Sequence, residues 1–146
     1  MRDILLTEAR RAALNAYAPY SNFRVGAALV VKAADGEHIV TGSNVENASF
    51  GITLCAERNA LSTACAIYST PSQDEVATRS AQKPLITHLA VSCLDAAQGA
   101  PATLKTPCGA CRQWFAELAP DAVFYIDGIE QDLHLADLLP LAFRLD

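Results

Sequence analysis

The sequence has no run of lysines and arginines longer than the pair at 10–11, and its net charge is −5. This argues against a nucleic-acid backbone as partner, because such binding needs clustered positive charge. No apolar run approaches the length of a membrane span, and the N-terminus has no signal-peptide core. We therefore expect a cytoplasmic protein with neither a nucleic-acid nor a membrane partner. A neutral small molecule is compatible with this charge.

Internal repeats and low-complexity segments are also absent, and the five cysteines are an odd number. Three of these cysteines fall in one motif, so a disulfide framework is disfavoured and a reducing compartment is expected. A chain of 146 residues that is 51% hydrophobic is too apolar for disorder and long enough to bury one core. We expect a single domain over residues 1–146.

Apolar periodicity predicts an alternation of helices and strands. Helices are predicted over 3–16, from about 53 and over 108–118, and strands over 24–32, 37–41, 86–93 and 122–126, with a short strand and helix turn at 133–139. An Asp-Gly pair at 35–36 predicts a hairpin between the first two strands. The segments 69–84 and 94–106 are predicted surface loops. The alternation indicates an α/β fold with a mixed sheet covered on both faces.

The motif with the clearest chemistry is Cys55-Ala56-Glu57, which is followed later in the chain by Pro-Cys-Gly-Ala-Cys at 107–111. Thiolates from Cys55, Cys108 and Cys111 would give Zn²⁺ three ligands. A tetrahedral ion would then keep one position open, as catalytic zinc sites do. Glu57 is placed to move protons beside that position. A Cys-x-Glu followed by Pro-Cys-x-x-Cys is a pattern of zinc-dependent base deaminases.

Both cysteine groups lie where helices are predicted to begin. Unpaired N–H groups at a helix start carry partial positive charge, which stabilises thiolates. Three thiolates leave a zinc site with a net negative charge, which weakens the metal as a Lewis acid. Arg58 and Arg112 could withdraw part of that charge, and we assign this role first to Arg58.

Beyond this motif, the chain resembles the small cytidine deaminases that act on free nucleosides. Blocks in the order of that family run from near the start to near the end of the chain, at residues 17–29, 42–49, 53–58, 107–113 and 138–143. The resemblance implies a three-layer α/β/α sandwich with a mixed sheet of about five strands. It also implies one Zn²⁺ per chain and Glu57 as the catalytic proton shuttle.

The resemblance further implies roles for residues that would otherwise have ordinary structural explanations. Asn44 and Glu46 could be turn residues, but in the family these positions hold the ribose hydroxyls. Phe23 could be a core aromatic, but the resemblance places it against the pyrimidine ring. Ala56 can contact the base only through its backbone. Phe143 could pack on its own domain, whereas in tetrameric members the matching residue reaches into a neighbouring subunit's active site.

The implied activity is hydrolytic deamination of free cytidine and 2′-deoxycytidine to uridine and 2′-deoxyuridine in pyrimidine salvage. The implied assembly is a homotetramer with active sites shared between subunits. The chain departs from many relatives at Phe50, Trp114 and the longer loops 69–84 and 95–106. These departures leave the zinc motif intact but bear on which substrates fit.

Three alternatives remain open at this stage. Blasticidin-type deaminases share the cysteine pattern but act on another aminated base. Nucleic-acid-editing and nucleotide deaminases usually have histidine as the first ligand, where this chain has Cys55. A zinc-stabilised module without catalysis would need a fourth ligand, and Cys93 is the candidate.

Overall fold

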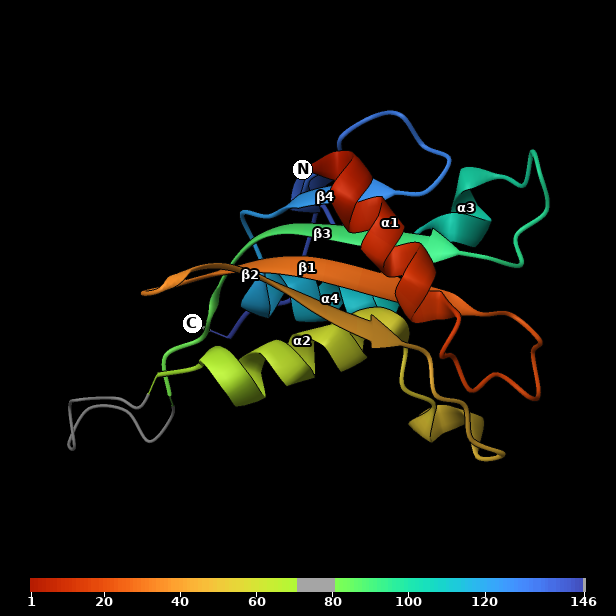
Figure 1. Ribbon diagram of the computed structural model, residues 1–146, viewed down its shortest axis with the longest axis horizontal. Coiled ribbons are helices and arrows are strands. Elements are labelled where there is room, and N and C mark those ends of the chain that lie inside the picture. The colour runs from red at the N-terminus through yellow and green to blue at the C-terminus, as the bar shows by residue number, and fades with distance from the viewer. Residues whose placement is uncertain (71–80, 146) are drawn as a thin grey trace.

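The computed structural model describes residues 1–70 and 81–145. Its four strands form one sheet in the order β2-β1-β3-β4, in which β1 is antiparallel to β2 and β3, and β3 is parallel to β4 (Figure 1). The elements are α1 (Arg2–Ala13), β1 (Val25–Ala33), β2 (Gly36–Ser43), η1 (Phe50–Ile52), α2 (Ala56–Tyr68), β3 (Leu85–Cys93), α3 (Ala102–Lys105), α4 (Gly109–Leu118), β4 (Val123–Ile126) and α5 (Leu135–Leu138).

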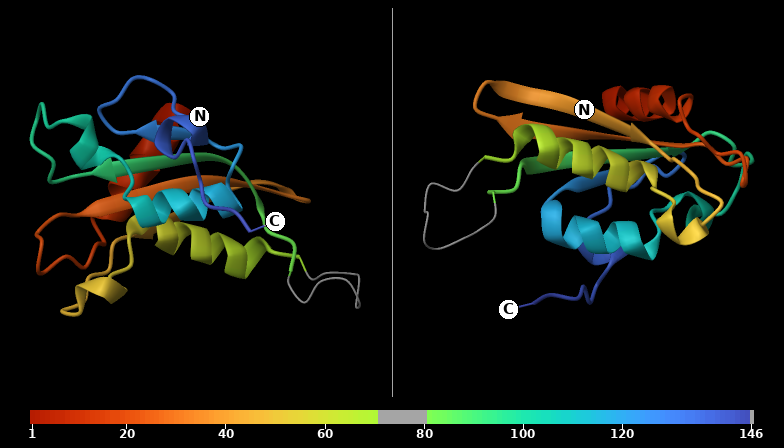
Figure 2. Two further views of the ribbon diagram at one scale, coloured as in Figure 1. Left: turned by 180° about the vertical axis from the view of Figure 1, so that it is seen from behind. Right: turned by 90° about the horizontal axis from the view of Figure 1, so that it is seen from below.

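Helices cover both faces of this sheet, with α1 on one side and α2 and α4 on the other (Figure 2). Alternate side chains of β1 divide between the two cores, because successive strand residues point to opposite faces. Ala28 and Val30 are buried with Leu5 under α1, whereas Leu29 is buried with Phe115 of α4. The predicted three-layer α/β/α sandwich is confirmed.

The expected count of about five strands is wrong, because the described residues form four. Leu133 makes a single antiparallel bridge to Phe124 of β4. The chain then turns into α5, where the Asp137 carboxylate accepts a hydrogen bond from the backbone N–H of His134 at 2.8 Å. This capping interaction favours a helix directly after Leu133, so the predicted short strand does not extend.

Two other boundaries differ from the predictions. Helix α1 ends at Ala13 rather than near residue 16, since the N–H of Tyr17 donates to the carbonyl of Asn44 and the chain must leave the helix to reach it. The predicted loop 94–106 contains the short helix α3. Of the other predicted loop, 69–84, residues 71–80 lie outside the described part of the chain. No helix within 1–70 and 81–145 combines the length and apolarity needed to cross a bilayer.

Two glycines let helices lie directly on the strands. A Cβ on Gly42 of β2 would lie 2.5 Å from the nitrogen of Ala60 and 2.6 Å from the carbonyl oxygen of Ala56, both in α2. A Cβ on Gly26 of β1 would lie 2.0 Å from the carbonyl oxygen of Ala9 in α1. Both contacts are with backbone atoms, which cannot rotate away. The start of α2 is therefore held at a fixed position over the sheet.

We expect Gly42→Ala to lower the free energy of unfolding by about 2 kcal/mol, because the added methyl group pushes the first turn of α2 off the sheet. Urea denaturation measures the change. Gly51→Ala is the matched control, since a Cβ there meets no atom within 4 Å. Equal destabilisation by the two variants would contradict close packing at Gly42.

Candidate active site

The site is built where two helices begin. Cys55 is the N-cap residue of α2, and Cys108 is the N-cap residue of α4. Neither side chain caps its own helix, so both sulfurs are available for other partners. Cys111 lies in the first turn of α4 and is fully buried. The prediction that both cysteine groups mark helix starts is confirmed.

The three sulfurs have the separations that a tetrahedral metal ion requires. The Sγ atoms of Cys55 and Cys108 are 3.9 Å apart, and those of Cys108 and Cys111 are 3.6 Å apart. All three Sγ atoms lie within 4.8 Å of one another. Zinc–sulfur bonds of about 2.3 Å at tetrahedral angles place sulfurs about 3.8 Å apart. The three cysteines are thus positioned to bind one zinc ion per chain.

Cys93 does not complete this group. Among the described residues, the cluster with metal-binding geometry consists of Cys55, Cys108 and Cys111 alone. The Cys93 thiol instead contacts the carbonyl oxygen of Lys105 at 3.8 Å. Burial raises the pKa of Cys93 to about 11, which disfavours the thiolate form. A closed four-sulfur site therefore lacks its candidate fourth ligand.

Arg58 contacts the sulfur cluster directly. Its Nη2 lies 3.6 Å from the Cys55 Sγ and donates to the carbonyl oxygen of Thr53 at 2.8 Å. Hydrogen bonding from Cys111, aided by Arg58, lowers the pKa of Cys55 to about 5. The thiolate is the form that binds a metal. Arg58 is thus placed to withdraw negative charge from the cluster.

Arg112 contacts oxygen atoms rather than sulfur. Its guanidinium donates to the carbonyl oxygens of Pro107 and Leu138, each at 2.7 Å, and to Oγ1 of Thr106 at 3.1 Å. These bonds join the segment before Cys108 to the end of α5. Arg112 therefore holds the loop that precedes the second cysteine motif, and its expected electrostatic role stays a prediction.

Glu57 is buried beside the cysteines, with 4% of its surface exposed. It lies in the first turn of α2, two residues after Cys55. Burial raises the pKa of Glu57 to about 7, because a desolvated carboxylate is disfavoured. A carboxyl group with such a pKa can both accept and release a proton near neutral pH.

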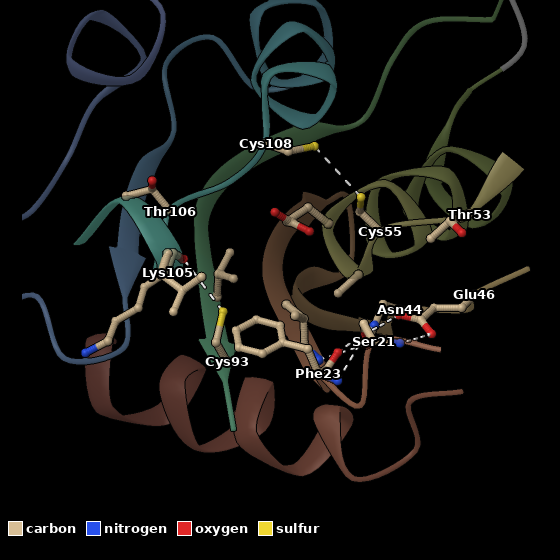
Figure 3. A pocket seen from close by; sticks show the side chains of 15 residues that line it. Ser21, Phe23, Asn44, Glu46, Thr53, Cys55, Cys93, Lys105, Thr106 and Cys108 are labelled. Carbon is tan, nitrogen blue, oxygen red and sulfur yellow. Dashed lines mark hydrogen bonds between the residues drawn. The ribbon is translucent and has the colours of Figure 1, made fainter. Parts of the chain in front are cut away.

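A pocket of about 370 Å³ lies at the carboxyl ends of β2 and β3, where β1 begins (Figure 3). Its lining contains most of the residues that the sequence predicted, from segments far apart in the chain. The lining residues are Ser21, Phe23, Val25, Asn44, Glu46, Thr53, Cys55, Ala56, Glu57, Val91, Cys93, Leu104, Lys105, Thr106 and Cys108. Cys111 is buried behind this surface.

Asn44 is 7% exposed and joins the two strands that border the pocket. Its Oδ1 accepts from the N–H of Val25 at 2.8 Å, and its Nδ2 donates to the carbonyl oxygen of Phe23 at 2.9 Å. One amide hydrogen and one acceptor position remain on this side chain. Asn44 therefore fixes the start of β1 and still has hydrogen-bonding capacity for a ligand.

Glu46, also 7% exposed, organises the segment before Phe23. Its carboxylate accepts from the N–H groups of Tyr20 and Ser21 and from the hydroxyl of Ser21. The hydrogen bond from Ser21 lowers the pKa of Glu46. The Ser21 hydroxyl in turn accepts from the N–H of Phe23 at 3.0 Å. Three of about four acceptor positions on the carboxylate are occupied, which leaves one for a ligand.

Phe23 and Phe143, the two aromatic residues predicted for the site, lie in different places. Phe23 is half-buried, and its ring forms one wall of the pocket between Cys93 and Asn44 (Figure 3). Phe143 is 69% exposed and does not line this pocket. The side chain of Gln113 in α4 holds the tail there by bonding both the N–H and the carbonyl of Phe143.

Sequence reasoning missed part of the pocket wall. Leu104, Lys105 and Thr106 come from the loop that was predicted only as surface. Cys93, at the end of β3, was considered only as a fourth zinc ligand. The sequence contained one indication of the loop's role, because the loop directly precedes Cys108. A segment that leads into a metal ligand must pass close to the metal.

The family model for the cytidine and deoxycytidylate deaminase zinc-binding region matches residues 2–127. The chain belongs to this deaminase family. A cytidine deaminase of Halalkalibacterium halodurans is 42% identical over 99% of this chain and 96% of its own length. A cytidine deaminase of Mycobacterium tuberculosis is 39% identical over 99% of this chain and 90% of its own length. The crystal structure of the Burkholderia pseudomallei cytidine deaminase has a TM-score of 0.74 and 38% identity, covering 98% of this chain and 99% of that one.

For this member of the deaminase family we expect Cys55→Ser, Cys108→Ser and Cys111→Ser each to retain less than about a tenth of the wild-type zinc, because each removes one thiolate ligand. Elemental analysis of purified protein measures zinc per chain. Cys93→Ser is the matched control and should keep one zinc per chain. Equal loss of zinc from Cys93→Ser would indicate a fourth sulfur ligand.

Proposed function

We propose that the chain, as a single domain over residues 1–146, hydrolyses free cytidine and 2′-deoxycytidine to the corresponding uridines with release of ammonia. The observation that carries this proposal is the buried Glu57, which lines one pocket together with Cys55 and Cys108 of the three-sulfur cluster. Hydrolysis of an amidine C–N bond needs an activated water and a group that moves protons, and this pocket offers a place for both.

The proposed steps follow from the position of Glu57. A zinc ion held by Cys55, Cys108 and Cys111 would lower the pKa of a water molecule at its fourth coordination position to roughly 7. Glu57 takes one proton from this water and delivers it to N3 of the cytosine ring, which makes C4 electrophilic, and the remaining hydroxide adds to C4. The same carboxyl group then moves the proton of the new C4 hydroxyl to the exocyclic amino group, so that the C4–N bond breaks, ammonia leaves and a C4 carbonyl forms. Arg58 contributes by withdrawing negative charge from Cys55.

The opposite side of the pocket suits a nucleoside. Asn44 and Glu46 each keep hydrogen-bonding capacity after their bonds within the chain, and a ribose diol offers two donors and several acceptors. The ring of Phe23 provides an aromatic face for offset stacking on the pyrimidine. Ala56, which is fully buried, presents its backbone to the base.

The charges around the pocket favour a nucleoside over a nucleotide. Among the described residues that line it, Lys105 is the only basic one, alongside the acids Glu46 and Glu57. The Lys105 side chain points away from Cys55 and Cys108, and its Nζ lies beside Gly128 (Figure 3). A phosphate would need clustered basic donors.

We further propose a cytoplasmic homotetramer that serves pyrimidine salvage. Phe143 is exposed at the end of a tail that Gln113 fixes on α4, so its ring is available to a neighbouring subunit. In this assembly Phe143 completes the active site of the adjacent chain. Each active site then contains residues from two chains.

The decisive experiment measures ammonia release from cytidine by zinc-loaded protein. We expect Glu57→Gln to keep its zinc and to lose at least about 10³-fold in kcat, because the amide cannot carry the proton. Glu117→Gln, an exposed glutamate in α4, is the control and should leave kcat unchanged.

Cytidine 5′-monophosphate and cytosine serve as comparison substrates in the same assay. Both should be much poorer than cytidine, since one adds a phosphate and the other lacks the sugar. No ammonia from cytidine or deoxycytidine, with one zinc per chain present, would refute the proposed function. Equal rates with the monophosphate would refute the choice of a nucleoside.

Phe143→Ala should raise KM for cytidine about tenfold through loss of an aromatic contact. Coexpression of Phe143→Ala with Glu57→Gln chains tests whether sites are shared. In mixed oligomers, a chain with intact Glu57 receives Phe143 from its neighbour, so a fraction of sites should recover the wild-type KM. No recovery in an oligomer shown by light scattering to contain both chains would contradict shared sites.

A further inference from the structure

Arg24 and Asp95 connect the two segments that bracket the pocket. Arg24 follows Phe23 and precedes β1, and Asp95 begins the loop that leads from β3 to α3. Both loops lie at the same end of the sheet, as both views of Figure 2 show. Neither residue lines the pocket that contains Glu57.

Three hydrogen bonds join Arg24 to Asp95, and a fourth joins Arg24 to the neighbouring Leu94. Nε of Arg24 donates to Oδ2 of Asp95 at 2.9 Å, and Nη2 donates to Oδ1 at 2.7 Å. The backbone N–H of Arg24 also donates to Oδ2 at 2.7 Å. In the opposite direction, the N–H of Leu94 donates to the carbonyl oxygen of Arg24 at 3.0 Å. Both backbone polar groups of Arg24 are thus bonded to residues 94–95.

This geometry differs from that of an ordinary surface ion pair. An exposed pair with a single contact contributes little, as expected for Lys32 and Glu37, which are 3.6 Å apart and about half exposed. The Arg24–Asp95 pair is bidentate, and its carboxylate also binds the main chain. Bidentate charge-assisted bonds fix relative orientation as well as distance.

The pair completes a set of bonds around Phe23. Ser21 accepts from the N–H of Phe23, and Asn44 binds its carbonyl oxygen. Ser21 is itself bonded to Glu46, so both contacts depend on the segment that follows β2. The next residue, Arg24, is held by Asp95 from the side of β3. The direction in which the Phe23 ring enters the pocket therefore depends on both neighbouring strands.

The other wall of the pocket is held at both ends by arginines. The loop starts at Asp95, bound by Arg24, and ends at Thr106, whose hydroxyl accepts from Arg112 at 3.1 Å. Leu104 and Lys105, just before that end, line the same pocket as Phe23. Loss of the first attachment would free the loop to move relative to the aromatic ring.

We infer that Arg24 and Asp95 are positioning residues for nucleoside binding, which act by fixing the distance between Phe23 and the loop 95–106. This inference rests on the proposed deamination of nucleosides. Phe23 and Leu104 line the pocket but carry no group that moves a proton, so their contacts with a bound nucleoside would be the same in the ground state and in the transition state. A change in their spacing therefore alters KM and leaves kcat per zinc nearly unchanged.

Kinetics of a double-mutant cycle test this inference. We expect Asp95→Ala to raise KM for cytidine about tenfold and Arg24→Ala about threefold, because Arg24→Ala keeps the bond from the backbone N–H to Asp95. The double variant should be no worse than Asp95→Ala, since the two residues act through one contact. Asp95→Asn should be intermediate. Glu37→Gln, which removes the exposed pair at the far end of the hairpin, should leave KM unchanged.

Unchanged KM in Asp95→Ala, or effects of the two single variants that add in the double variant, would overturn the inference. So would a fall in kcat per zinc as large as the rise in KM, because this would indicate general damage to the site. Thermal unfolding of each variant separates loss of positioning from loss of folding.

A second measurement does not depend on turnover. Hydrogen exchange should become faster in Asp95→Ala at residues 21–23 and 25 as well as at 96–106. A merely local effect would appear only at residues 94–96 and at Arg24, whose N–H loses its acceptor, and would overturn the inference. If wild-type protein produces no ammonia from cytidine, the proposed function fails, and the exchange result still decides whether the pair couples the two walls.

Discussion

The first turn of α2 lies against β2 at a distance that only a glycine permits, since a Cβ on Gly42 would overlap the backbone of α2. Cys55 and Glu57 belong to that turn, so their positions relative to the sheet are set by this contact. Cys108 begins α4 on the same face, with its sulfur 3.9 Å from that of Cys55. The metal-binding geometry thus depends on backbone packing between helix and sheet. The cysteine side chains do not have to hold the helices in place themselves.

Burial of a carboxyl group beside three thiols is electrostatically costly, and the structure offsets that cost in several ways. The cluster lies at the starts of two helices, where unpaired N–H groups carry partial positive charge, and Arg58 contacts the Cys55 sulfur. Burial raises the pKa of Glu57, so the neutral acid is accessible near neutral pH. On the opposite side of the pocket, Asn44 and Glu46 use most of their hydrogen bonds to order the chain around Phe23. Residues proposed to bind the sugar therefore also build the wall against which the base would stack.

Local patterns predicted the two helices at the cysteine motifs and the hairpin at Asp35-Gly36, with the start of α2 placed about three residues too early. They predicted the strands β1, β3 and β4 to within one or two residues. They failed where a distant contact overrides a local preference. Helix α1 stops early because Tyr17 must bond Asn44, and the strand expected near residue 133 is reduced to one bridge because Asp137 caps a helix. The pocket residues at 104–106 were missed for a related reason, because the composition of a loop does not indicate whether it will line a pocket.

The sequence by itself determined the ligand set, the acid beside it and the family, because these depend on residue types at short, fixed spacings. Tertiary structure decided that the two cysteine motifs meet. With strand order β2-β1-β3-β4, the connections β2-α2-β3 and β3-α4-β4 step across the sheet in the same direction. Right-handed crossovers then place both helices on one face, with both starts at the carboxyl ends of parallel strands. The pairing of Arg24 with Asp95 likewise follows from the antiparallel register of β1 and β3. This register cannot be read from residue spacing along the chain.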